Sequence, residues 1–370
     1  MADGANREVE NSKESEKELN RDWANLPTDV LCLMLPHLFL GDIKRFHNVC
    51  RSWRLAPTDQ SVQSPVLMCF GNDSTRCKFF HPLYKDSYSM YIPELFGAIP
   101  RFSKGGWLLM SRGKYSVFFF NPFTKALINL PALPDMYDFG GITFTSSPTL
   151  SDCKVFGISV KFEEYFSIST ICRGEESWHV LRGENNLPFF LSHCNPVFHH
   201  GEFYCLGRHG NLGVFNPGED WRILDKPHRQ PLDDPIVSHE RNFLVECNGE
   251  LLSVSMSFMG KLISVLKLDS VEMAWHKVDS LVDQMLFVSH TSSLSAKRVV
   301  QGMENKIYLP RIHGKCGVFY SLASGLFQTL GNDFTHKDLH GTGELLSCCW
   351  IEPKANTSYS EEELNWFEDA

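Results

Sequence analysis

Residues 200–224, HGEFYCLGRHGNLGVFNPGEDWRIL, contain three signals of β-structure in a fixed order. His200-Gly201 is a turn signal of the kind that supplies positive φ in a tight hairpin, and the apolar pair after it begins a strand. Phe215-Asn216-Pro217 marks the end of a later strand, since proline cannot donate to a β-ladder. Trp221 begins a further strand. The glycines between Leu206 and Gly213 are typical of a loop that joins two strands of one unit.

Each of the three signals recurs along the chain. The turn signal is found again at Gly105-Gly106, Asn248-Gly249 and Glu304-Asn305, and in each case a pair of strand-forming residues follows. The aromatic-x-Pro ending recurs at residues 80–82 and 120–122, and tryptophan begins strands at Trp178 and Trp275. The repeat length is roughly 40 to 55 residues, which is close to the length of a four-stranded propeller blade.

The repeats predict a mostly β chain that forms a β-propeller of about six blades behind a small N-terminal α module. The expected units are centred near residues 66–95, 105–134, 142–183, 195–228, 242–282 and 298–331. Each holds about four strand-sized runs except the first, which holds three. The late strand Leu345–Ile351 would complete the first blade and close the ring. A pair of β-sandwiches is the alternative, and the one helix expected in this region covers Ser280–Leu286.

A different pattern precedes the repeats. Residues 26–54, LPTDVLCLMLPHLFLGDIKRFHNVCRSWR, are rich in apolar side chains at helical spacing. Pro27 suits the first position of a helix that ends near Leu35, ahead of Pro36. Asp42 is a plausible N-cap for a second helix, and a third short turn begins at Cys50. A module of this size buries too little apolar surface to be stable alone, so we expect a partner protein to cover the rest. The alternative is that these helices cap the downstream domain.

This segment resembles an F-box, the three-helix motif that docks onto the Skp adaptor of cullin-type ubiquitin ligases. Leu26-Pro27 matches the opening Leu-Pro of the family, and Asp29 and Leu31 match the positions that follow. Asp42-Ile43 matches its Asp-Leu, and the run from Val49 to Trp53 matches its closing Val-Cys-(Lys/Arg)-x-Trp. Pro36 departs from the pattern and shortens the first helix. The resemblance implies a Skp contact made by Leu26, Pro27, Leu31, Ile43, Val49, Cys50 and Trp53.

The second region resembles the kelch-like C-terminal domain of a large plant family of F-box proteins, although it lacks the regular double glycine of true kelch repeats. The expected organisation is a disordered acidic tail over 1–21, an F-box over 22–56, a linker over 57–65, the propeller over 66–352 and an acidic tail over 353–370. The last tail contains Trp366 and Phe367, which either pack on the propeller or form a docking motif.

Composition excludes several classes of function. The net charge is −9, of which residues 1–20 contribute −3 and residues 353–370 contribute −4, so the body of the chain carries only −2. No basic field exists for nucleic acid. No apolar run approaches the length of a membrane span. The polar N-terminus and twelve scattered cysteines predict an intracellular protein, cytoplasmic or nuclear, with reduced thiols.

No catalytic motif is found in the sequence, which has no nucleophile elbow, P-loop or dinucleotide fingerprint. His193, Cys194, His199, His200, Cys205 and His209 form a cluster in sequence. Their spacing does not fit a tetrahedral zinc site, and His199 and His200 would face opposite sides of a strand. We therefore expect no catalytic residue, no metal and no cofactor.

Together the two resemblances imply a non-enzymatic substrate receptor of a Skp–cullin–F-box ubiquitin ligase. The F-box would bind Skp and, through it, cullin, and the propeller would hold a target protein for ubiquitin-dependent degradation. Three alternatives remain open. The chain could be a Skp-bound scaffold, a sensor with a small molecule in the propeller channel, or a propeller enzyme.

Overall fold

The computed structural model describes residues 23–35, 45–56, 64–82, 87–218, 220–228, 241–257, 260, 262–329, 332–334, 343–344, 347–353 and 359–367. The chain divides into two compact units, residues 1–62 and 63–370. The division falls inside the stretch 57–65 that the sequence predicts as a linker. Each unit is considered separately below.

The first unit contains short helices. They are the 3₁₀ turn η1 (Trp23–Asn25), helix α2 (Thr28–Met34) and helix α4 (Arg51–Arg54), with a further helical turn at residues 45–47. Pro27 is the N-cap of α2 and not its first residue, while Asp29 lies in the first turn as expected. The helix ends at Met34, with Leu35 as its C-cap directly ahead of Pro36. Asp42 and Ile43 lie outside the described residues.

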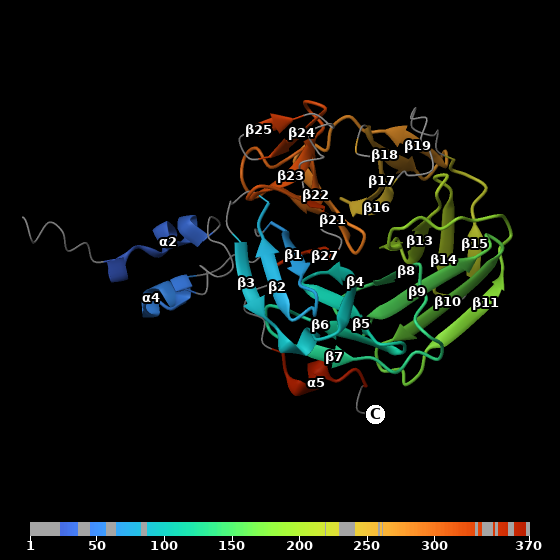
Figure 1. Cartoon of the computed structure of the whole chain (residues 1–370), viewed down its shortest axis with the longest axis horizontal. Coiled ribbons are helices and arrows are strands. Elements are labelled where there is room, and N and C mark those ends of the chain that lie inside the picture. The colour runs from blue at the N-terminus through green and yellow to red at the C-terminus, as the bar shows by residue number, and fades with distance from the viewer. Residues whose placement is uncertain are drawn as a thin grey trace, which may run out of the picture. The chain divides into compact units, whose positions relative to one another are not determined.

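The second unit is a propeller of six sheets around a common axis (Figure 1). The first sheet has the order β27 (Cys348–Ile351), β1 (Val66–Phe70), β2 (Arg76–Phe80) and β3 (Ser87–Tyr91). The second contains β4 (Ala98–Lys104), β5 (Trp107–Arg112), β6 (Ser116–Phe120) and β7 (Leu127–Asn129). The third contains β8 (Gly141–Phe144), β9 (Lys154–Lys161), β10 (Tyr165–Cys172) and β11 (His179–Glu184).

The remaining three sheets complete the ring. The fourth contains β12 (Val197–His199), β13 (Glu202–Leu206), β14 (Leu212–Asn216) and β15 (Asp220–Ile223). The fifth contains β16 (Arg241–Cys247), β17 (Glu250–Met256), β18 (Ile263–Asp269) and β19 (Ala274–Lys277). The sixth is larger, with β20 (Gln284–Val288), β21 (Ser293–Lys297), β22 (Lys306–His313), β23 (Cys316–Ser321), β24 (Leu326–Thr329), β25 (Asn332–Phe334) and β26 (Gly343–Glu344).

The ring is closed by the strand β27, as the sequence predicts. It pairs antiparallel with β1, in a register that places Trp350 opposite Leu67. The first strands of neighbouring sheets contact one another around the axis, and β27 contacts both β4 and β22. This pairing joins the C-terminal strand to the first sheet, and the innermost strand of each sheet faces the axis as a short, protected edge.

The three sequence signals fall at equivalent places in the blades. Gly105-Gly106, His200-Gly201 and Asn248-Gly249 form two-residue hairpins between the first and second strands, and all six residues have positive φ. The aromatic-x-Pro signals end the third strands β2, β6 and β14. The tryptophans lie at or just before the fourth strands β11, β15 and β19.

Three details of the expected repeat are wrong. The second blade begins at Ala98, so Gly105-Gly106 lies inside it. Asn305 has positive φ but does not form a hairpin, because β22 pairs parallel with β20. The helix expected over Ser280–Leu286 is absent, and strand β20 begins at Gln284. The run from Gln284 to Val288 is buried throughout, and such a short apolar run does not distinguish a strand from a buried helix.

The repeated tryptophans join neighbouring blades. The indole Nε1 of Trp178 donates to the carbonyl oxygen of Pro131 at 2.9 Å, and that of Trp221 donates to Asn185 Oδ1 at 2.9 Å. The indole of Trp275 donates to the carbonyl oxygen of Gly210 at 2.7 Å. Each acceptor belongs to the preceding blade or to the loop after it. The motif therefore stabilises contacts between blades, since each buried N–H finds its partner there.

We expect Gly213→Ala to destabilise the propeller. A Cβ at Gly213 would lie 2.2 Å from Cη2 of Trp221, so the indole would have to move. Overpacking of this kind costs about 1–3 kcal/mol. Urea denaturation measures the free energy of unfolding. Gly218→Ala is the control, because its Cβ would meet only Asn216 Oδ1 at 3.3 Å. Equal stability of the two variants would show that Trp221 is not fixed in place.

The C-terminal segment packs on the propeller. Ser360 caps the short helix α5 (Glu361–Leu364) and forms a capping box with Glu363. The Trp366 side chain is buried and stacks on Phe119, with ring centroids 5.9 Å apart. The guanidinium of Arg173 donates to carbonyl oxygens of this segment. Trp366 is therefore part of the propeller core and is not available as a docking motif.

Candidate functional site

The core of the helical module is formed by five buried side chains, Leu31, Leu35, Phe46, Trp53 and Ala56. The rings of Phe46 and Trp53 lie 4.5 Å apart. Two hydrogen bonds join the end of the module to its start. Trp53 Nε1 donates to the carbonyl oxygen of Trp23 at 2.8 Å, and Ser52 Oγ donates to the carbonyl oxygen of Ala24 at 2.6 Å. A hydrogen bond with Ser52 lowers the pKa of Cys50, which is the N-cap of α4.

The seven residues implied by the resemblance fall into different environments. Leu31 and Trp53 are buried in the module core, and Leu26 and Cys50 are half-buried. Pro27 and Val49 are exposed, the latter by 55%. Ile43 lies outside the described residues. A side chain buried in the module core positions the helices, so a partner protein would meet the exposed and half-buried members of the set.

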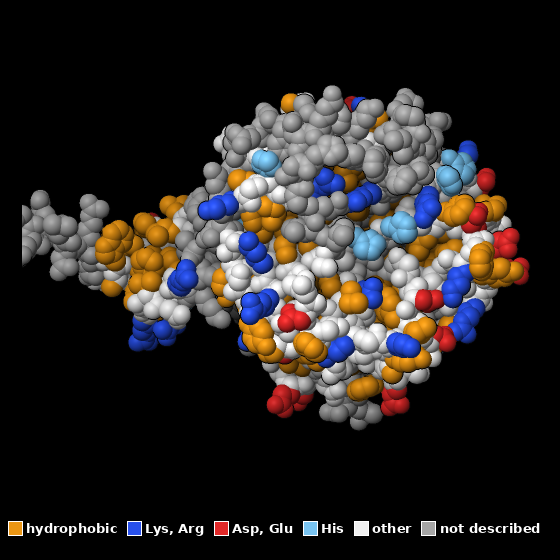
Figure 2. Space-filling view, in the orientation of Figure 1, with side chains coloured by type: hydrophobic (Ala, Val, Ile, Leu, Met, Phe, Trp, Pro, Cys, Tyr) orange, Lys and Arg blue, Asp and Glu red, His pale blue; other side chains and the backbone are white. Residues whose placement is uncertain are grey.

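Further apolar side chains are exposed on the same module. Leu33 is 73% exposed and Val30 is 38% exposed. Val30 and Leu33 have the spacing i and i+3, so they lie along one side of α2, whereas Leu26 precedes the N-cap and packs partly against the module core. Trp23 and Leu55 are also exposed by more than half. Figure 2 shows hydrophobic side chains gathered on this module. We refer to Val30 and Leu33 as the apolar face of α2. The resemblance alone did not identify Val30 and Leu33, although their helical spacing was present in the sequence.

The propeller carries a pocket of about 380 Å³ that combines polar and apolar groups. It is lined by residues at the start of the innermost strands β16 and β27, by residues ahead of β12, and by the ends of β20 and β22. It therefore opens on the face at which the innermost strands begin, which we call the pocket face. Its size is within the range typical of ligand sites.

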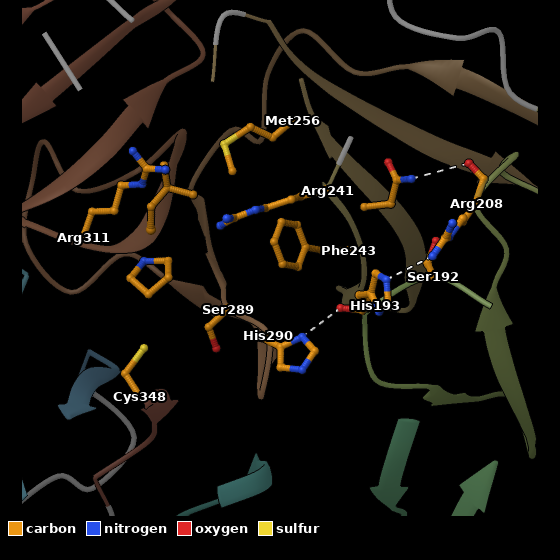
Figure 3. A pocket seen from close by; sticks show the side chains of 13 residues that line it. Ser192, His193, Arg208, Arg241, Phe243, Met256, Ser289, His290, Arg311 and Cys348 are labelled. Atoms are coloured by element: carbon orange, nitrogen blue, oxygen red, sulfur yellow. Dashed lines mark hydrogen bonds between the residues drawn. The ribbon is translucent and has the colours of Figure 1, made fainter. Parts of the chain in front are cut away.

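Five basic side chains are among the described residues that line the pocket (Figure 3). Arg208, Arg241, Arg311, His193 and His290 line it, and its thirteen described lining residues include no aspartate or glutamate. Its apolar surface comes from Phe243, Met256 and Leu309. Figure 2 shows arginine, lysine and histidine side chains near the middle of the face in view. This grouping could not be predicted from the sequence, because the residues come from three different blades.

In the part of the chain that the structure describes, no three of the metal-ligand candidates from the sequence lie close enough to share an ion. The expectation that His199 and His200 face opposite sides of a strand is wrong, because His200 is a turn residue with positive φ and the two ring centroids lie 4.0 Å apart. Cys194 and Cys205 are buried, whereas His193 and His200 are exposed. Burial raises the pKa of Cys194 to about 12, which disfavours the thiolate that a metal requires. Among the described residues, the group close enough to share an ion is Asp269, Glu272 and His276. It is largely exposed and lies on the β18–β19 turn, where Asp269 accepts hydrogen bonds from the backbone.

Comparison with known proteins identifies both regions. Residues 79–320 match the family model described as KIB1-4 beta-propeller. F-box/kelch-repeat protein At1g57790 of Arabidopsis thaliana is 34% identical, with 94% of this chain and 98% of the relative covered. F-box protein At3g56470 of the same plant is 30% identical, with 81% and 82% covered. The match to the first of these relatives spans the helical module as well as the propeller, since it covers 94% of this chain.

Solved structures resemble the chain only distantly. A quinoprotein alcohol dehydrogenase-like protein from Bacteroides thetaiotaomicron has a TM-score of 0.36 at 8% identity, with 79% of this chain and 76% of that chain covered. No helix among the described residues is long and apolar enough to cross a membrane.

Proposed function

Because the chain belongs to the plant F-box proteins that carry a KIB1-4 beta-propeller, we propose that it is a substrate receptor of a Skp–cullin–F-box ubiquitin ligase. The F-box binds a Skp adaptor, and the propeller holds a target protein for ubiquitination and degradation. The chain itself catalyses no reaction. Its contribution is proximity, since tethering raises the local concentration of the target near the ubiquitin-conjugating enzyme.

The observation that carries this proposal is the exposed apolar surface of the helical module. The side chains of Leu33 and Val49 are exposed to solvent. Neighbouring apolar side chains that are exposed together often mark a site where another protein binds. Contiguous apolar surface beside polar residues is typical of a protein interface. Leu26, Pro27, Val49 and Cys50, with Val30 and Leu33, are accordingly proposed to meet Skp, and Ile43 is retained from the resemblance. Leu31 and Trp53 are proposed to hold these residues in position.

Replacement of Leu26 and Pro27 by alanine tests this assignment. We expect the double variant to lose co-purification with a co-expressed plant Skp adaptor, because Leu26 packs against the module core and Pro27 is the exposed N-cap of α2. The propeller should remain folded, as circular dichroism and size-exclusion chromatography would show. Unchanged co-purification would refute the Skp assignment.

A second experiment tests the ubiquitination role. Proteins that bind the wild-type chain in plant cells can be compared with those that bind the double variant, and the half-life of each can then be measured. A receptor predicts targets that bind both forms but are degraded only in the presence of the wild-type chain. A scaffold without a ligase role predicts the same half-life with either form.

A further inference from the structure

We propose that the pocket binds an oxyanion-bearing side chain, a carboxylate or a phosphate, in a segment of the target protein. This inference rests on the proposed receptor function and specifies what the propeller recognises. The chemistry of the lining supports it: arginine presents planar pairs of donors that match carboxylate and phosphate oxygens. Three arginines and two histidines line the pocket, without an acidic residue among the described lining residues.

Arg208 is the best-placed of these groups. It lies in the loop between β13 and β14, and its Nη2 lies 3.1 Å from Nε2 of His193. A guanidinium only donates hydrogen bonds, so the His193 nitrogen accepts and the imidazole is neutral in this arrangement. Burial first, and then the charges of Arg208 and His290, lower the pKa of His193. Arg208 pairs with no carboxylate among the described residues, which leaves its charge available to a partner.

The position of the Arg208–His193 pair is fixed from two sides. Nδ1 of His290 lies 3.1 Å from the carbonyl oxygen of His193, and since a carbonyl only accepts, the histidine donates (Figure 3). The guanidinium carbon of Arg208 lies 5.9 Å from the ring centroid of Phe190, within cation–π range. Donors held in place before binding lose less entropy when they meet an anion.

A second observation points to a ligand. Ser192 lines the pocket and is only 3% exposed, yet its Oγ has no hydrogen-bond partner among the described residues. A buried hydroxyl is normally satisfied, so an unpaired one in a binding pocket marks a place where a ligand can supply the partner. An oxyanion, with several acceptor lone pairs, could serve both Ser192 and the arginines.

The pocket face also offers the apolar contacts that a protein segment needs. Phe243, Met256 and Leu309 form an apolar wall within the pocket, and the Phe190 ring beside Arg208 is 40% exposed. A target segment in which a charged residue stands next to an apolar residue would contact both the arginine side chains and the apolar wall. Aromatic and arginine side chains are the residue types most enriched at the energetic centres of protein interfaces.

The test uses the full-length chain and fluorescein-labelled peptide pools whose central residue is fixed as glutamate, phosphoserine or glutamine, with apolar residues beside it. Fluorescence anisotropy should show at least about tenfold tighter binding of one or both anionic pools than of the glutamine pool, as expected for a charge-assisted contact. The glutamate and phosphoserine arms distinguish the two sources of the oxyanion. Arg208→Glu should remove the preference, and Arg208→Gln should reduce it.

Arg182→Glu is the matched control, because it makes the same change of charge on the outermost strand of the third blade, where Arg182 pairs with exposed Asp135. This variant should keep the preference for anionic pools. The proposal is overturned if no pool binds, if the glutamine pool binds equally well, or if Arg208→Glu and Arg182→Glu behave alike. Skp co-purification is measured on the same samples. It should be unaffected by Arg208→Glu, so a failure here is distinguishable from a failure of the receptor function.

Discussion

Leu33→Asp is expected to abolish binding of the Skp adaptor while the chain stays folded. Leu33 is 73% exposed, so the substitution removes little from the module core. At an interface, however, it would delete a buried leucine contact of about 1.5–3 kcal/mol and place a charge against apolar surface. A loss of about 100-fold or more in affinity follows, since each factor of ten is about 1.4 kcal/mol. Isothermal titration calorimetry with purified Skp measures the loss.

The controls for Leu33→Asp separate binding from folding. Leu150→Asp introduces the same change at a residue of the propeller that is also exposed by about half, and it should leave Skp affinity unchanged. Leu31→Asp should unfold the helical module, because Leu31 is fully buried there. If Leu33→Asp bound Skp as tightly as the wild type does, the apolar face of α2 would not be the interface.

Trp350→Ala is expected to lower the free energy of unfolding of the propeller by about 3–5 kcal/mol, the usual cost of truncating a buried tryptophan. Trp350 lies on the closing strand β27, where its backbone N–H donates to Ser292 Oγ at 2.7 Å and its indole donates to the carbonyl oxygen of Val288 at 3.2 Å. Ser103 on β4 donates to its carbonyl oxygen. The residue thus joins three neighbouring sheets.

The loss at Trp350 is large compared with the stability of a typical domain, which is about 5–15 kcal/mol. Urea denaturation followed by circular dichroism measures it. Tyr115→Ala truncates a half-exposed aromatic residue of the propeller and should cost about 0.5 kcal/mol or less. If both variants lost similar stability, ring closure by β27 would not be a main determinant of propeller stability.

The regular part of the propeller can be predicted from the sequence, because each of its turn and strand signals has a local physical cause. A two-residue hairpin needs positive φ, and Asn248-Gly249 provides it wherever the rest of the chain lies. The closing strand could be predicted because the first unit holds three strand-sized runs where the others hold about four. The second blade begins earlier than the repeat predicts, because β4 contains Pro100, which interrupts the strand pattern, and its register is irregular between Pro100 and Phe102.

The sixth sheet and the pocket could not be predicted for a different reason. Strand β20 pairs parallel with β22, and a parallel pairing leaves no hairpin signal in the sequence. The pocket brings together His193, Arg208, Arg241, His290 and Arg311, which are far apart in sequence. In the helical module, the motif identified the right segment, but only the structure separates buried Leu31 from exposed Leu33.

Hydrogen exchange of the full-length chain, with and without a plant Skp adaptor, tests the central claim most directly. The account predicts that the adaptor slows amide exchange in residues 26–55 and leaves exchange in the propeller strands unchanged. No protection in that segment at saturating adaptor, or protection confined to the propeller, would contradict it.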